Sequence, residues 1–254
     1  MLYDITDKRF PLRNFLLSVL PPDEFNFLRP HMEPVSYPVG TVYAEFCDPL
    51  RHVFFPNRGM ISLLSVTEAG QSCEVGFIGF EGIVGMDVVI GKNEMPYQAL
   101  VQAASDGYKV PVDAVIELFN RGTVFHDASL RFAYVLLRQF AQTSACNRFH
   151  GIQPRLCRWL AIMCERSECN NLLLTQEFLA YMLGVQRTSI ATIAHSMQDD
   201  GIISYSRGKI DILDLDRLRS EACECLSVID DELSSFLASK KYFPVSAIRQ
   251  TARG

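Results

Sequence analysis

The sequence lacks long apolar runs, since no hydrophobic stretch in its 254 residues approaches the ~20 residues that a membrane-spanning helix needs. Its first residues also lack a basic segment followed by an apolar one, which is the pattern of a secretory signal. We therefore expect a cytoplasmic protein with no membrane partner. A strong charge bias is absent too, with 24 basic and 29 acidic residues, so any attraction to nucleic acid has to come from a local basic patch.

Catalytic and cofactor motifs are missing as well. The sequence contains no P-loop, no GxGxxG, no GxSxG and no HExxH. Its five histidines show no triad-like grouping. We therefore expect that the protein is not an enzyme, that it has no catalytic residues and that it holds no cofactor.

The eight cysteines show no regular spacing. The two closest groups are Cys164 with Cys169 and Cys223 with Cys225, and neither has the spacing of a zinc pair or a suitably placed histidine beside it. We therefore expect reduced thiols and no metal site.

The character of the chain changes along its length. Residues 11–32 have helical spacing interrupted by prolines, whereas residues 35–112 consist of short runs rich in Val, Ile, Phe and Tyr separated by glycines. No alternation of strands and helices occurs there, so a small antiparallel barrel or roll is predicted.

A long helix is predicted from about His126 to Phe149, because this stretch contains no Gly or Pro. One of its faces repeats at spacings of four and three, through Leu130, Tyr134, Leu137, Ala141 and Ser144. Such a stripe suits pairing with the same helix of a second chain. Packing of this face on the protein's own roll is the alternative that the sequence leaves open.

Residues 174–197 have the pattern of two short helices joined by a tight turn. Thr175 can cap the first helix, Gly184 can supply the turn, and Ile190, Ile193, Ala194 and Met197 give the second helix an apolar stripe. This pattern predicts a helix-turn-helix. The second helix leaves polar side chains on its outer side, namely Gln186, Arg187, Thr188, Ser189, Thr192 and His195.

The N-terminal half of such a helix enters the major groove of DNA, and Arg187 is the best candidate for a bidentate contact to guanine. Residues 201–213 then alternate polar and apolar around Arg207-Gly208, which predicts a β-hairpin wing. Arg207 and Lys209 at its tip suit phosphate contacts, and we expect Asp199, Asp200, Asp211 and Asp214 to lie beyond the contact face.

Two function classes follow from these residues. One is a transcription regulator that binds double-stranded DNA; the other is a small-molecule sensor or binding protein whose helix-turn-helix serves protein contacts. A protein-contact module should expose apolar groups on the outer face of residues 186–195, and this one exposes polar groups. The sequence therefore favours DNA.

Over about residues 12–225 the sequence resembles the bacterial cyclic AMP receptor protein and fumarate–nitrate regulator (CRP/FNR) family. The stretches that carry the resemblance are 174–213, HVFFPNRGMI at 52–61 and EGIVG at 81–85. The resemblance implies an α+β fold with an N-terminal antiparallel β-roll (cyclic nucleotide-binding-like, a double-stranded β-helix), a long dimerisation helix and a C-terminal winged helix-turn-helix. It also implies a homodimer that reads a palindromic operator and recruits or blocks RNA polymerase.

The expected domains are a roll at 1–125, a dimerisation helix at 126–150, a DNA-binding domain at 151–225 and a helical extension with a tail at 226–254. The expected effector pocket contains Gly85, Met86, Tyr97, Gln98, Thr143 and Ser144, by analogy with the nucleotide site of the family.

The sequence departs from the family at several of these positions. Gly85-Met86 stands where cyclic nucleotide-binding members have Gly-Glu, and Tyr97-Gln98 where they have Arg-Ser. Without a cation, an enclosed phosphate would be poorly compensated, so we do not expect cyclic AMP to be the effector. The first cysteine is Cys47, so the N-terminal cysteine cluster of the iron–sulfur members is not expected either.

Overall fold

The computed structural model describes residues 12–239. The ends of two predicted domains, residues 1–11 of the roll and 240–254 of the tail, lie outside the described residues. No helix of the described residues is long and apolar enough to cross a membrane.

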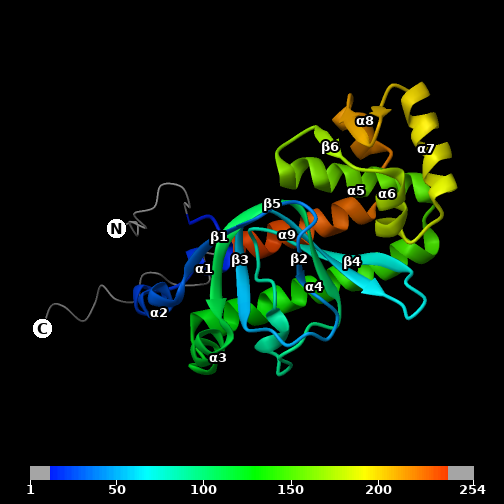
Figure 1. Ribbon diagram of the computed structural model, residues 1–254. Helices are drawn as coiled ribbons and strands as arrows, with labels where there is room; N and C mark the ends of the chain where they lie inside the picture. Colours follow the sequence, from blue (N-terminus) through cyan, green and yellow to red (C-terminus); the bar gives the residue numbers. More distant parts are fainter. Residues whose placement is uncertain (1–11, 240–254) are drawn as a thin grey trace, which may run out of the picture.

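The N-terminal half is an antiparallel roll (Figure 1). Short helices open the chain: α1 (Phe15–Ser18), α2 (Pro22–Leu28) and the 3-10 helix η1 (Arg29–His31). The strands are β1 (Glu33–Tyr37), β2 (Val42–Ala44), β3 (His52–Val66), β4 (Ser72–Ile78) and β5 (Gln98–Pro111). Their order is β1-β5-β3-β4, with β2 also paired to β5 and every pairing antiparallel. The predicted roll is thereby confirmed.

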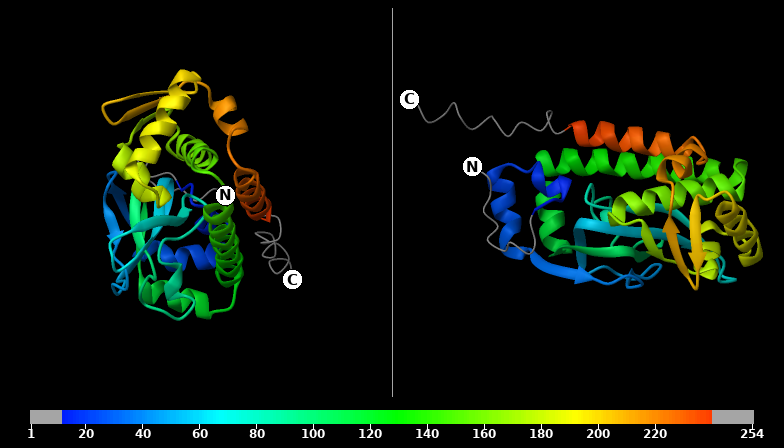
Figure 2. Two further views of the ribbon diagram at one scale, coloured as in Figure 1. Left: turned by 90° about the vertical axis from the view of Figure 1, so that its right-hand side faces the viewer. Right: turned by 90° about the horizontal axis from the view of Figure 1, so that it is seen from above.

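Helices then connect the roll to the C-terminal half. After α3 (Val112–Asn120), the helix α4 (Val124–Phe149) runs along the roll for 26 residues. Its inward face buries Phe125, Phe132 and Leu136 in the core of the roll. This core also includes Phe236 of the C-terminal helix α9 (Cys225–Ala238). Figure 2 shows that α9 lies beside α4 along much of the length of α9.

The C-terminal half packs at the other end of the molecule from α1 and α2 (Figure 1). It contains α5 (Ile152–Ser167), β6 (Asn171–Leu173), α6 (Gln176–Leu183), α7 (Arg187–Asp199), β7 (Ile203–Ser206), β8 (Lys209–Ile212) and α8 (Leu215–Ser220). The three short strands form a separate antiparallel sheet in the order β6-β8-β7. An α+β fold with a winged helix-turn-helix is therefore confirmed.

Buried polar contacts join the two halves. Trp159 of α5 donates a hydrogen bond from Nε1 to Glu74 of β4 at 3.1 Å, and Arg166 forms an ion pair with Glu81 at 2.6 Å. Apolar residues of the roll, including Met60 and Phe77, also belong to the core of the C-terminal half. The C-terminal half is thus held against the roll by both apolar and charge-assisted contacts.

Candidate nucleic-acid interface and effector pocket

The helix-turn-helix consists of α6, the turn at Gly184 and α7. The Thr175 hydroxyl accepts a hydrogen bond from the Phe178 backbone N–H at 3.1 Å, as predicted for a helix cap. Gly184 has φ +62°, which a residue with a side chain adopts only with strain. The turn residue and the cap therefore fix the geometry between the two helices.

The apolar stripe of α7 faces inward and leaves its polar stripe outside. Ile190, Ala194 and Met197 are buried. Exposed positions on the opposite side are Gln186, Arg187, Thr188, Thr192 and His195, whereas Ser189 is half-buried. Figure 1 shows α7 on the outside of the C-terminal half. The structure thus presents the predicted contact residues on one accessible face.

Arg187 is the first residue of α7, directly after the N-cap Gln186. Among the described residues, no acidic side chain forms an ion pair with it. A guanidinium at this position is available as a forked donor to a base edge. The positive charge of Arg187 also acts on Tyr205 of β7, where it opposes the rise in the pKa of the phenol that burial causes.

The wing is the hairpin of β7 and β8. Arg207 and Gly208 both have positive φ, +50° and +76°, as a two-residue hairpin turn requires. The Gly208 carbonyl accepts a hydrogen bond from the Leu174 N–H at 2.8 Å, which places the wing tip beside the Thr175 cap. Thr175, the wing tip and the recognition helix are therefore held in one arrangement.

Two acidic side chains lie closer to this face than the sequence suggested. Asp211 reaches Lys209 at 3.4 Å, and Asp199 reaches His195 at 3.7 Å, one turn away on α7. Of the four aspartates expected beyond the contact face, Asp199 and Asp211 therefore do not lie there. Their charges partly offset Lys209 and, when it is protonated, His195. Arg187 and Arg207 remain the principal cations of the face.

The expected effector pocket is only partly assembled. Met86 and Tyr97 are buried, and Gly85 has φ +94° at the start of the 3-10 helix η2 (Met86–Val88). Tyr97 packs on Phe140 of α4 and donates a hydrogen bond from its hydroxyl to Asp87 Oδ2 at 2.8 Å. Burial raises the pKa of Asp87, although the Tyr97 bond acts in the opposite direction. Asp87 was not among the residues predicted for the pocket, although it directly follows Met86 in the sequence.

Other residues of the expected pocket point elsewhere. Gln98, the first residue of β5, donates a hydrogen bond from Nε2 to Glu45 at 2.7 Å on the surface, whereas Tyr97 directly before it is buried. Thr143 is buried in α4 and its neighbour Ser144 is exposed. The pair Tyr97-Gln98 therefore does not act as one unit inside the roll.

The expected dimerisation stripe lies on the exposed face of α4. Leu130, Tyr134 and Leu137 are 45%, 56% and 65% exposed, and Ala141 and Ser144 are exposed too. The face that packs on the roll contains other residues, such as Phe132 and Leu136. The alternative that the stripe covers the protein's own roll is therefore wrong.

The cysteines are arranged differently from what their spacing suggested. His150 lies next to Cys225, with Nδ1 and Sγ 3.4 Å apart, so the expectation that no suitable histidine accompanies the cysteines is wrong. Cys146 and Cys223 are hydrogen-bonded at 3.5 Å, and this bond lowers the pKa of the Cys223 thiol and raises that of the Cys146 thiol. The sequence feature that could have indicated this cluster is the four-residue spacing of Cys146 and His150 at the end of a predicted helix.

Comparisons with known proteins agree with this geometry. Residues 154–221 match the Crp-like helix-turn-helix domain family. No curated protein sequence matches the chain. A transcriptional regulator described as of the CRP/FNR family, from Eubacterium rectale, is 16% identical with a TM-score of 0.67, over 84% of this chain and 97% of its own.

Two further solved structures are similar. FixK2 from Bradyrhizobium japonicum is 12% identical, with a TM-score of 0.63 over 76% of this chain and 98% of its own. CLP from Xanthomonas campestris, described as a c-di-GMP-responsive global regulator, is 16% identical, with a TM-score of 0.59 over 75% and 98%. At these identities the structures establish the fold. The chain therefore carries a Crp-like helix-turn-helix domain on the fold of the CRP/FNR regulators, which confirms the resemblance found in the sequence.

Proposed function

We propose that the protein regulates transcription by binding a specific double-stranded DNA site with α7. The observation that carries this proposal is the exposed polar face of α7, with Arg187 unopposed by an acidic partner among the described residues. Side chains at the N-terminal half of a recognition helix are the ones that reach base edges in the major groove. Arg207 at the wing tip and the N-terminus of α6 at Thr175 supply phosphate contacts on either side.

The same face argues against a helix-turn-helix that binds another protein. Its apolar residues are used inside the C-terminal core, and what remains outside is short and polar. Protein interfaces are enriched at their centres in aromatic and apolar side chains, which this face lacks.

The proposal includes a homodimer formed through the exposed stripe of α4. A twofold dimer presents two copies of α7 and therefore reads a palindromic operator, with half-site centres about 10 base pairs apart or a multiple of that. Such a regulator acts in the cytoplasm by recruiting or blocking RNA polymerase.

Cyclic AMP is not part of the proposal. The buried groups beside Met86 are Tyr97 and Asp87, and a buried carboxylate repels a cyclic phosphate instead of compensating it. An effector of this roll, where one exists, is less anionic than a nucleotide.

In vitro selection from fragmented genomic DNA tests the proposal. The purified protein should enrich fragments that share an inverted repeat with the half-site spacing given above. Enrichment of a sequence without twofold symmetry would contradict the homodimer and leave DNA recognition intact. Fragments indistinguishable from the starting pool would contradict the proposed function.

A further inference from the structure

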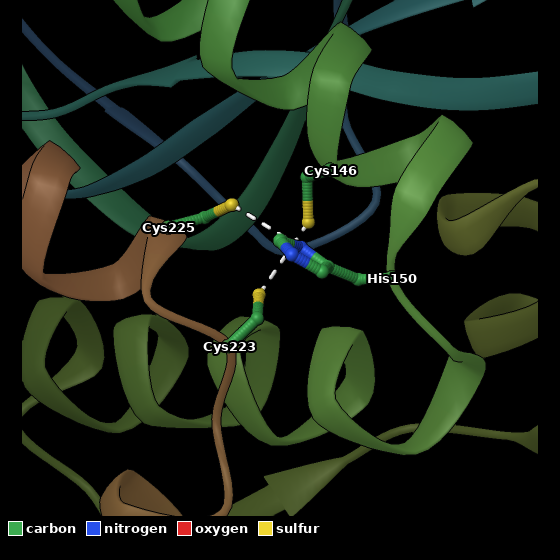
Figure 3. A group of neighbouring side chains, drawn as sticks. All are labelled: Cys146, His150, Cys223 and Cys225. Carbon is green, nitrogen blue, oxygen red and sulfur yellow. Dashed lines mark hydrogen bonds between the residues drawn. The ribbon is translucent and has the colours of Figure 1, made fainter.

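Four metal-binding side chains converge where the end of α4 meets the loop between α8 and α9 (Figure 3). Cys146 lies in the last turn of α4 and His150 caps its C-terminus, whereas Cys223 comes from the loop after α8 and Cys225 is the first residue of α9. Each offers one ligand atom, and these four atoms all lie within 4.8 Å of one another. Segments more than 70 residues apart in the sequence thus supply one compact set of three thiols and an imidazole.

The distances suit a single tetrahedral ion. Zinc binds thiolate sulfur at ~2.3 Å and imidazole nitrogen at ~2.0 Å, so tetrahedral ligands lie roughly 3.5–3.8 Å from one another. Cys146 Sγ lies 3.5 Å from Cys223 Sγ, and Cys225 Sγ lies 3.4 Å from His150 Nδ1. An iron–sulfur cluster would hold its ligand sulfurs farther apart, because several irons and sulfides occupy the space between them.

The residues around the four ligands have the roles expected beside a metal. His150 turns Nδ1 toward the sulfurs, and its Nε2 lies 3.1 Å from a carboxylate oxygen of Glu224. A metal-bound histidine donates its other ring N–H to such a carboxylate, which fixes the tautomer and the ring orientation. Gln142 donates a hydrogen bond from Nε2 to the sulfur of Cys225 at 3.0 Å.

The local charge is also complementary. Three thiolates, a neutral imidazole and Zn²⁺ carry a net charge of −1. Arg158 of α5 is only 3% exposed, its positive charge acts on Cys146 and Cys223, and its Nε has no hydrogen-bond partner among the described residues. A buried cation needs nearby negative charge, and a thiolate-bound zinc would add to that of Glu74, on which Arg158 also acts.

We propose that Cys146, His150, Cys223 and Cys225 bind one Zn²⁺ ion in a closed structural site. Four protein ligands leave no open position for a substrate, so the ion serves to connect segments and not to catalyse a reaction. The segments it connects are the end of α4, which carries the proposed dimer stripe, and the start of α9, which follows the helix-turn-helix. Zinc would therefore fix the C-terminal half relative to the dimerisation helix. This inference stands on its own residues and does not depend on DNA binding.

Cobalt substitution tests the site in the full-length protein. After chelation under reducing conditions, added Co²⁺ should bind at one equivalent, with intense visible bands of a tetrahedral ion and a thiolate-to-cobalt charge-transfer band. One equivalent of Zn²⁺ should then abolish this spectrum. Cys223→Ser should weaken binding at least about tenfold and reduce the charge-transfer band, whereas Cys169→Ser, at an exposed cysteine outside the cluster, should leave both unchanged.

Thiol alkylation followed by peptide mass spectrometry gives a second readout on the wild-type chain, which remains informative where a variant fails to fold. Zn²⁺ should protect Cys146, Cys223 and Cys225 from alkylation, and chelation should expose all three together. Three results would each overturn the proposal: no stoichiometric Co²⁺ binding, an unchanged spectrum in Cys223→Ser, or a Cys146–Cys223 disulfide in protein alkylated directly at cell lysis.

Discussion

Asp87 is an acidic side chain held inside the roll by hydrogen bonds from the Tyr97 hydroxyl and from its own backbone N–H. Burial raises the pKa of its carboxyl above that of the unfolded chain. The folded state therefore retains this proton to higher pH than the unfolded state does. The stabilising contribution of the neutral carboxyl is present in acid and is lost as the pH rises through the raised pKa.

Replacing Asp87 by Asn removes this titration while keeping an oxygen that can accept the Tyr97 bond. We expect the free energy of unfolding of Asp87→Asn, relative to wild type, to rise between acidic and neutral pH. Urea unfolding of both proteins across that range measures the difference. A difference that is independent of pH, or that falls toward neutrality, would show that the Asp87 carboxyl is not strained by burial.

The pocket beside Asp87 also makes a prediction about ligands. Titration calorimetry with cyclic AMP should show no binding at micromolar concentration, because Tyr97 and Met86 replace the expected cation and carboxylate anchors. Heat of binding that disappears in Tyr97→Phe would place the nucleotide in the roll and refute this account of the pocket.

At the residue scale, the sequence predicts best what depends on neighbours along the chain. The Thr175 cap, the Gly184 turn and the Arg207-Gly208 hairpin each need only a few adjacent residues, and all three are present as expected. The cysteine cluster depends on how α9 folds back onto α4, and no local pattern encodes that packing. The contact of Gln98 with Glu45 was missed for the same reason, whereas Lys209 and Asp211 lie two residues apart on one face of β8 and their pairing could have been predicted from the strand pattern.

At the scale of elements, α4 has three faces with different partners. One face packs on the roll, another contacts α9, where Arg138 and Glu232 form an ion pair at 3.5 Å, and the third is the exposed stripe of Leu130, Tyr134 and Leu137. Adjacent large apolar side chains left in water mark a surface for association. We propose a second copy of α4 as its partner, because the spacing of the stripe alternates between four and three residues.

Replacing Leu137 with Asp should separate the dimer. A charge buried in the seam without a partner costs several kcal/mol, which corresponds to a rise of at least about 100-fold in the dimer dissociation constant. Analytical ultracentrifugation measures that constant. The matched control is Leu213→Asp, at a leucine that is 61% exposed outside α4, and it should remain dimeric. A Leu137→Asp protein that still sediments as a dimer would move the interface elsewhere.

The bounds of α4 and the architecture of each half, a roll and a winged helix-turn-helix, could be predicted from the sequence, whereas the strand pairing could not. Helical periodicity and the lack of Gly or Pro predicted α4 to within a few residues of its observed bounds. Strand β1 pairs with β5, with Glu33 opposite Lys109, and such long-range pairing leaves no mark on local spacing. The helical spacing over residues 11–32 forms short separate helices, because Asn14 caps α1 and Pro22 begins α2.

For the whole molecule, the distribution of cations limits how strongly DNA is attracted. Within residues 151–213 the exposed cations are Arg187, Arg207 and Lys209, because Arg155 and Arg158 are buried and Arg166 pairs with Glu81. A dimer thus offers six exposed cations to DNA. Each phosphate neutralised contributes about 0.9 to the slope of log affinity against log salt, so the slope should have a magnitude of about 5 or less.

Binding measured over a range of salt concentrations tests this value. Arg207→Ala, which removes two cations per dimer, should reduce the magnitude of the slope by about 2. A wild-type slope as steep as about 10 would mean that cations outside this face carry much of the binding.

The most direct test of DNA recognition compares the selected operator with a scrambled duplex for wild type, Arg187→Ala and Arg207→Ala. A bidentate base contact is worth about 1–3 kcal/mol, so Arg187→Ala should lose at least about fivefold of the preference for the operator while keeping its fold. Arg207→Ala should weaken binding to both duplexes by the same factor, because a phosphate contact does not read sequence. An operator-to-scrambled ratio that is unchanged in Arg187→Ala would contradict the assignment of α7 as the recognition helix.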